Sequence, residues 1–140
     1  MSGPEHAQPQ PFAEDPDTAG FWEAARRGEL ALRFCPRCDQ PVHFPRAYCD
    51  RCPGTATHWR SVRPAATLYS WTRAEHQVHR AFAVPYTIVL VELDDHPGVR
   101  LVGSLDGAPV LRIGAPMHLV FETLADGSVL PQWHPALPED

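Results

Sequence analysis

Two CxxC pairs constrain this chain more than any other feature of its sequence. They contain all four cysteines of the chain, and the ten residues 39–48 separate them. A CxxC turn lets two thiolates converge on one metal ion, and a second turn supplies the other half of a tetrahedral site. Four thiolates leave no coordination position for water, which favours a structural role over catalysis. The sequence therefore predicts one structural zinc ion bound by Cys35, Cys38, Cys49 and Cys52.

Disulfides or a redox-active CxxC are the alternative interpretation of these cysteines. Residues 1–10 are polar and have neither the basic start nor the apolar core of a secretory signal. No βαβ pattern surrounds the cysteines, as a thioredoxin-like motif would require. We therefore favour zinc and expect a cytoplasmic protein. Such a site contributes on the order of 10 kcal/mol to folding, so the ribbon should be disordered without metal.

The size of the chain limits what can accompany the zinc ribbon. With 140 residues there is room for one small domain besides a metal-stabilised module, and a large catalytic fold is excluded. No apolar stretch approaches the roughly 20 residues that span a bilayer. Charge is unevenly distributed, because residues 64–140 carry nine acidic residues against four arginines. We therefore expect no membrane association, and nucleic acid is a poor partner for such an acidic segment.

The residues before the ribbon predict a tail and one short helix. Residues 1–16 are rich in proline, glutamine and acids and have no periodicity, so we expect a mobile tail. Thr18 is the expected N-cap of the helix, and Gly28 is its expected stop. Residues 30–34 alternate as in a strand that leads into the first cysteine pair.

The pattern changes after the ribbon to short apolar runs separated by turns. Residues 94–98, 113–116 and 125–127 carry the glycine, proline and aspartate typical of turns. Five short strands without a long helix favour a small closed or partly open barrel. Residues 88–91 are apolar at every position, so both faces of that strand should be covered, in part by a partner. The expected strands are 67–73, 86–93, 99–105, 117–123 and 129–133.

No pattern of catalytic residues stands out. The serines lack a nucleophile-elbow context, and no GxGxxG or P-loop sequence occurs. Glu92, Asp94 and Asp95 follow a strand into a turn, where solvated charge is common. His76 and His79 lie in a loop and are weak candidates for a second metal site. We therefore assign no catalytic residues and expect that the chain has no active site of its own.

An ordered series of residues gives the chain a familiar profile. The series comprises Phe21-Trp22, Gly28, Leu30, the two CxxC pairs, Pro45-Arg46, Tyr69-Ser70, Pro85-Tyr86, Val91-Glu92-Leu93, Ile113-Gly114 and Val120-Phe121-Glu122. With this series the chain resembles, over roughly residues 20–135, the zinc-ribbon plus OB-fold proteins that accompany thiolase-like enzymes, including aldolases that shorten steroid side chains. Asp39 and Pro53 depart from the glycine that often follows each cysteine pair, although Asp tolerates a left-handed turn and Gly54 follows at once.

The resemblance implies a mainly β fold with an N-terminal helix, a rubredoxin-like zinc ribbon and a C-terminal five-stranded OB-fold barrel. The expected divisions are a disordered tail at 1–16, helix and ribbon at 17–62, the barrel at 63–136 and a tail at 137–140. Members of this family resemble subunits rather than enzymes, because the thiolase-like partner supplies the catalytic residues. The resemblance therefore implies an accessory subunit that helps form the acyl-CoA site of its partner, in steroid or lipid degradation.

Surplus aromatic and basic residues gain a use from this resemblance. Most of the aromatics can be explained by core packing, but a CoA ester offers an adenine for stacking and phosphates for arginine. The candidate ligand-binding residues are Tyr69, Trp71, Arg73, Arg80 and Phe82. The candidate partner-interface residues are Phe21, Trp22, Ile88 and Leu90. Two other hypotheses remain, a nucleic-acid-binding module and an independent metalloenzyme, which would need an open metal site.

Overall fold

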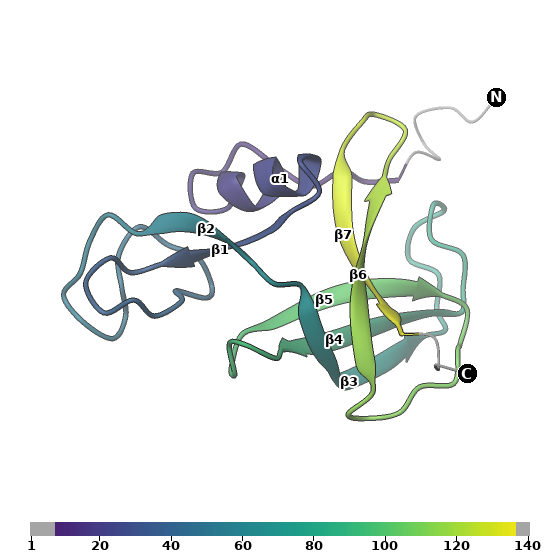
Figure 1. Cartoon of the computed structure of the whole chain (residues 1–140). Coiled ribbons are helices and arrows are strands. Elements are labelled where there is room, and N and C mark those ends of the chain that lie inside the picture. The colour runs from purple at the N-terminus through teal and green to yellow at the C-terminus, as the bar shows by residue number, and fades with distance from the viewer. Residues whose placement is uncertain (1–7, 137–140) are drawn as a thin grey trace.

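The computed structural model describes residues 8–136, so the expected tail at 137–140 and the first seven residues of the expected tail at 1–16 lie outside it. Within the described residues, seven strands form two sheets, and one helix precedes them in the chain (Figure 1). No helix among the described residues has the length and apolar content to span a bilayer. The elements are α1 (Ala19–Arg26), β1 (Leu30–Phe34), β2 (His58–Val62), β3 (Ala65–Ala74), β4 (Tyr86–Leu93), β5 (Arg100–Asp106), β6 (Pro116–Thr123) and β7 (Val129–Pro135).

Helix α1 occupies the place that the sequence predicts. Thr18 is the N-cap residue, as the sequence predicts, although its side chain makes no capping hydrogen bond. Gly28 ends the helix with φ +74°, and its N–H donates to the Ala25 carbonyl at 3.0 Å. Ala24 and Ala25 are buried, which leaves room for the helix to lie close against β1.

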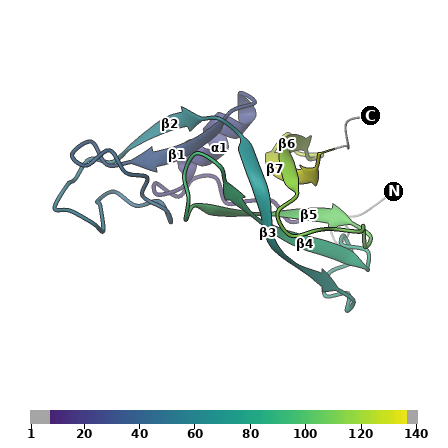
Figure 2. The same cartoon turned by 60° about the horizontal axis from the view of Figure 1, so that its bottom comes forward.

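The ribbon is carried by the hairpin-like pair of β1 and β2. These strands run antiparallel, with Leu30 opposite Val62 and Phe34 opposite His58. The sequence analysis did not predict β2, because most of its side chains are exposed and no apolar alternation marks it. Its backbone groups are nevertheless ordered by pairing with β1. Both cysteine pairs lie in the loops between these two strands, which project from the barrel (Figures 1 and 2).

The second sheet confirms all five expected barrel strands to within two residues at each end. Its strand order is β5-β4-β3-β6-β7, with every neighbouring pair antiparallel. Strand β3 pairs with β4 along its length but with β6 only through residues 65–67. A bulge between Leu68 and Ser70 bends it, so the sheet curls and β6 and β7 cross over β3–β5 (Figure 1). The mainly β fold class is confirmed.

The barrel closes through a side chain rather than through a ladder of backbone hydrogen bonds. The Ser104 N–H in β5 donates to Gln132 Oε1 in β7 at 2.8 Å, and Gln132 Nε2 donates to Glu122 at 3.1 Å. Gly103 allows this close approach, because a Cβ there would lie 2.9 Å from the Trp133 backbone nitrogen. The result is a partly open barrel of the OB-fold type.

One hydrophobic core joins the barrel to the base of the ribbon. Val89, Val91 and Trp133 are fully buried in it, together with Leu32 and Phe34 of β1. The apolar run 88–91 is not covered on both faces within this chain, because Ile88 is 37% exposed and Leu90 is only partly buried. The outer face of β4 is therefore apolar and accessible.

Candidate metal centre and surface sites

The four cysteine sulfurs converge as the sequence predicts. Cys35 Sγ lies 3.5 Å from Cys52 Sγ, Cys38 Sγ lies 3.8 Å from Cys49 Sγ, and all four lie within 4.8 Å of one another. A tetrahedral zinc ion with Zn–S bonds of about 2.3 Å sets neighbouring sulfurs about 3.8 Å apart. All four cysteines are free of disulfides. The sulfur positions therefore fit a closed Cys₄ zinc centre.

Backbone hydrogen bonds fold each cysteine pair into a tight turn. Asp39 adopts the left-handed conformation with φ 57°, and its N–H donates to the Cys35 carbonyl at 2.9 Å. Aspartate therefore substitutes for the glycine often found at this position. In the second turn the Gly54 N–H lies 3.3 Å from Cys52 Sγ, and the Arg51 N–H lies 3.3 Å from Cys49 Sγ. Such N–H donors stabilise thiolate ligands.

Gly54 packs tightly against two of the cysteine sulfurs. It is buried, and a Cβ at this position would lie 2.5 Å from Cys35 Sγ and 3.1 Å from Cys52 Sγ. A larger residue would therefore push the Cys35 ligand out of place. Pro53 stands where a glycine often follows the second cysteine pair. Because Gly54 comes next and keeps this close contact, Pro53 does not disturb the metal centre.

The thiols differ in acidity before metal binds. The backbone N–H of Cys38 lowers the pKa of Cys35 to about 7, from a usual value of 9.0. The Gly54 N–H lowers the pKa of Cys52, but burial and the neighbouring thiols outweigh it and raise that pKa to about 12. Zinc binding at neutral pH must therefore release at least the proton of Cys52.

The five candidate ligand residues do not form one site. Tyr69 lies beneath Arg100, whose Cζ is 4.0 Å from the ring centroid. Trp71 is 40% exposed and pairs with Val89 of β4, and Arg73 forms an ion pair with Glu75 at 3.0 Å. Phe82 lies apart from these, 6.2 Å from Tyr86 between ring centroids. Arg80 is exposed in the same loop as Phe82.

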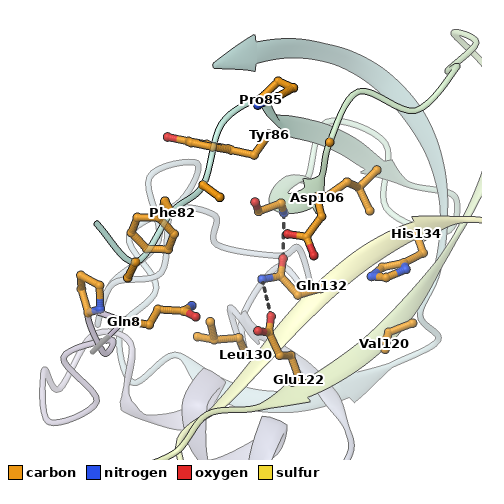
Figure 3. A pocket seen from close by; sticks show the side chains of 16 residues that line it. Gln8, Phe82, Pro85, Tyr86, Asp106, Val120, Glu122, Leu130, Gln132 and His134 are labelled. Carbon is orange, nitrogen blue, oxygen red and sulfur yellow. Dashed lines mark hydrogen bonds between the residues drawn. The ribbon is translucent and has the colours of Figure 1, made fainter. Parts of the chain in front are cut away.

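Phe82 lines a cavity of about 760 Å³, here called the loop cavity (Figure 3). The cavity opens between the loop before β4 and the ends of β5–β7. Asp106 and Glu122 place two carboxylates on its wall, and no arginine lines it. A phosphate group is therefore disfavoured there. Its other lining residues include Gln8, Pro85, Tyr86, Ser104, Val120, Leu130, Gln132 and His134.

A second hollow of about 550 Å³ lies between the ribbon and the barrel and is here called the ribbon–barrel groove. It brings together three of the four candidate interface residues, Phe21, Trp22 and Leu90. Ile88, the fourth candidate, lies outside the groove. It shares the outer face of β4 with Leu90, because alternate residues of a strand lie on the same face. Its other lining residues are Thr18, Ala31, Leu32, Arg33, His43, Phe44, Pro45, Trp59, Gly98, Arg100, Leu101, Val102, Pro131 and Trp133.

The sequence analysis missed most of this groove. Arg33, Trp59 and Val102 come from three different strands, and no local pattern brings them together. The one available signal was Arg33, a charged residue in a strand whose neighbours are all apolar. Phe44 gave no signal at all, because it lies in a loop.

The remaining candidates are engaged in structural contacts. Asp95 forms a two-pronged ion pair with Arg63 at 2.7 and 2.8 Å, Thr67 Oγ1 donates to Asp94 at 2.7 Å, and Glu92 pairs with Arg100 at 3.2 Å. These three acids therefore stabilise the β4–β5 hairpin and its surroundings. Within residues 8–136, only the four cysteines gather three or more metal-ligating side chains closely enough to share one ion.

The fold and the centre define a protein built from a zinc ribbon and an OB-fold. Residues 22–58 match the family model described as the rubredoxin-like zinc ribbon domain of ChsH2. Residues 59–122 match the model of the C-terminal OB-fold domain of ChsH2. The chain belongs to the ChsH2 family, and its ribbon has four cysteines positioned to bind a metal ion.

Several known proteins are similar to this chain. A probable enoyl-CoA hydratase alpha subunit of Thermomonospora curvata is 36% identical over 98% of this chain, which spans 43% of the length of that relative. A chain of the solved Ltp2-ChsH2(DUF35) aldolase is 31% identical with a TM-score of 0.81, and the match covers 91% of this chain and 100% of that one. A DUF35 protein of unknown function from Sulfolobus solfataricus, 17% identical, matches with a TM-score of 0.58 over 75% of this chain and 78% of that one, and supports the fold alone.

Proposed function

We propose that this protein is a non-catalytic accessory subunit that binds a thiolase-like catalytic subunit and helps form its acyl-CoA site. One observation carries the proposal. The match to the Ltp2-ChsH2(DUF35) aldolase runs over the whole of the matched chain, and the name of that aldolase joins two components. A chain that corresponds to all of one component is expected to need the other.

The chemistry of the chain supports a dependent role. Its zinc centre has four sulfur ligands and therefore offers no open position to a substrate or a water molecule. The carboxylates of the β4–β5 hairpin are engaged in ion pairs and hydrogen bonds. The ribbon–barrel groove meanwhile presents an apolar surface of the kind that a partner covers. The catalytic residues therefore belong to the partner.

The acyl-CoA role is assigned to two separate surfaces. Trp71 and Arg73 lie two residues apart on β3 and provide an aromatic ring and a cation for the nucleotide end of CoA. Phe82 lies in the loop cavity, whose carboxylates disfavour phosphate, so this cavity suits a neutral part of the thioester. Arg80 lies in the loop that joins β3 to β4. The substrate class that we assign to the complex is the CoA thioester of a steroid or lipid side chain.

Co-expression with a thiolase-like subunit from the same host tests this function. We expect a stable complex, and we expect retro-aldol or thiolytic cleavage of acyl-CoA esters only when both proteins are present. Replacing Trp71 and Arg73 together should raise KM for the CoA ester without dissolving the complex. Full activity of the thiolase-like protein alone would refute the accessory role, and co-purification of RNA or DNA in place of a protein would favour a nucleic-acid-binding module.

A further inference from the structure

The ribbon–barrel groove has the composition of the centre of a protein–protein interface. Three of the four tryptophans of the chain line it, namely Trp22, Trp59 and Trp133, and so do Arg33 and Arg100. Tryptophan and arginine are the residues that most often contribute the largest share of binding energy at such interfaces. The groove is therefore suited to a protein surface rather than to a small polar ligand.

Large apolar side chains at this groove are exposed to solvent. Phe44 of the ribbon is 75% exposed, and Val102 of β5 is 65% exposed. The segments that carry them are held together, because His43 Nε2 lies 3.0 Å from the Arg100 carbonyl oxygen. Burial lowers the pKa of His43 below its usual value, so its ring adds no positive charge at neutral pH. Phe44 and Val102 are thus exposed apolar side chains that line the same groove, one from the ribbon and one from the barrel.

Arg33 is a nearly buried cation with weak partners. Its side chain is 12% exposed, and its Nη1 lies 3.4 to 3.6 Å from Asp17 and 3.5 Å from the Pro16 carbonyl. Its Nε is the one buried side-chain nitrogen or oxygen in residues 8–136 that has no hydrogen-bond partner. A guanidinium with one unsatisfied donor and only long contacts at Nη1 costs free energy to bury, so an acceptor from outside the chain that reaches its terminal nitrogens would be stabilising.

We infer that the groove docks a segment of the catalytic subunit that inserts an apolar side chain beside Phe44 and Val102 and supplies an oxygen acceptor to Arg33. The inference rests on the proposed function and specifies the surface used. A second copy of this chain fits less well, because a symmetric contact would bring the Arg33 and Arg100 guanidinium groups of both copies together. Charge complementarity therefore favours a different protein that offers carbonyl or carboxylate oxygens.

Three variants of the full zinc-loaded chain test the groove against the thiolase-like subunit of the same host. Val102→Asp places a charge on the wall of the groove, and Arg33→Met removes the donors but keeps a side chain of similar length. Val110→Asp is the matched control, because Val110 is fully exposed and lies outside the groove. We expect the first two changes to weaken binding at least about tenfold and the control to change it less than about twofold.

Hydrogen exchange on the wild-type complex provides a readout that does not depend on any variant. Amides near Phe44 and in β5 should gain protection when the partner binds, while those of residues 108–112 should not. Unchanged affinity in both groove variants, with their zinc content and melting temperature intact, would overturn the groove as the docking surface but leave the proposed function standing. A wild-type chain that does not bind the thiolase-like subunit would overturn both.

Discussion

The ribbon and the barrel of this chain are stabilised by different means. Inside the ribbon the buried hydrophobic cluster consists of Cys35, Val42 and Cys49, which are too few to form an apolar core. The barrel, with the base of the ribbon, has twelve buried residues in one cluster. A metal centre therefore replaces hydrophobic burial in one region, while burial alone is sufficient in the other.

The physical boundary between these regions does not follow the order of the chain. Strand β1 pairs with β2 of the ribbon, but its Leu30, Leu32 and Phe34 side chains lie in the barrel core. Loss of zinc should therefore disorder the cysteine loops and leave β1 attached to the barrel. This comparison yields four predictions, which follow in order of decreasing effect.

Removal of zinc should have the largest effect and should be confined to the ribbon. Chelation, or the change Cys35→Ser, removes a site that contributes on the order of 10 kcal/mol in comparable ribbons. We expect residues 35–57 to lose hydrogen-exchange protection while β3–β5 retain theirs. Adding zinc back should restore the chelated wild type but not the variant. Simultaneous loss of protection in both regions would show that they fold as one unit.

Trp133→Ala should have the converse effect. Trp133 is 1% exposed and packs beside Gly103 at the closure of the barrel, so its removal leaves a large cavity. We expect a loss of about 3–5 kcal/mol in the free energy of unfolding, measured in urea with zinc present. Trp71→Ala, at an exposed tryptophan of the same barrel, is the control and should cost much less. Equal losses in the two variants would contradict the assignment of the core.

Gly54→Ala should weaken the metal site without harming the barrel. The added Cβ would collide with Cys35 Sγ, so we expect zinc affinity to fall about 10- to 100-fold, as it does when groups that support metal ligands are changed. Competition with a chromophoric chelator measures this. The neighbouring exposed residue gives the control Thr55→Ala, which should bind zinc as the wild type does. An unchanged affinity for Gly54→Ala would mean that the turn relaxes freely.

Local patterns predicted the parts of this fold that local chemistry determines. The spacing of the cysteines defines the metal site because each CxxC turn is a short-range structure. The barrel strands were found because each is a short apolar run between turns, as at residues 88–91 of β4, although the structure buries Val89 and Val91 and leaves Ile88 exposed. Turns such as 94–98 carry their own residue signals.

Contacts that depend on long-range register escaped the sequence analysis. Strand β2 is defined by its pairing with β1 and not by its own pattern. A period of two residues would place Tyr69 and Trp71 on the same face of β3. The bulge after Leu68 separates them instead. Tyr69 now lies under Arg100, whereas Trp71 lies opposite the buried Val89. The ribbon–barrel groove has the same origin, because its lining comes from both regions of the molecule.

Asp95→Asn should have the smallest effect, because it removes one exposed ion pair between the segment after β2 and the β4–β5 hairpin. Arg63 lowers the pKa of Asp95 through hydrogen bonds and charge, although partial desolvation opposes this. A carboxyl whose pKa is lowered on folding stabilises the protein above its unfolded pKa of about 3.8, and this stabilisation is lost as pH falls through the folded value.

The difference in stability between wild type and Asp95→Asn should therefore be constant above about pH 5 and vanish toward pH 2. Urea unfolding of the barrel, followed by tryptophan fluorescence, measures this difference at each pH. Zinc loss at low pH affects both proteins equally and cancels in the difference. Glu75→Gln is the matched control, because Glu75 pairs with Arg73 of the same barrel and does not reach the segment after β2. Equal changes in stability for Asp95→Asn and Glu75→Gln at every pH would show that the Arg63–Asp95 ion pair contributes no more to stability than the local Arg73–Glu75 pair does.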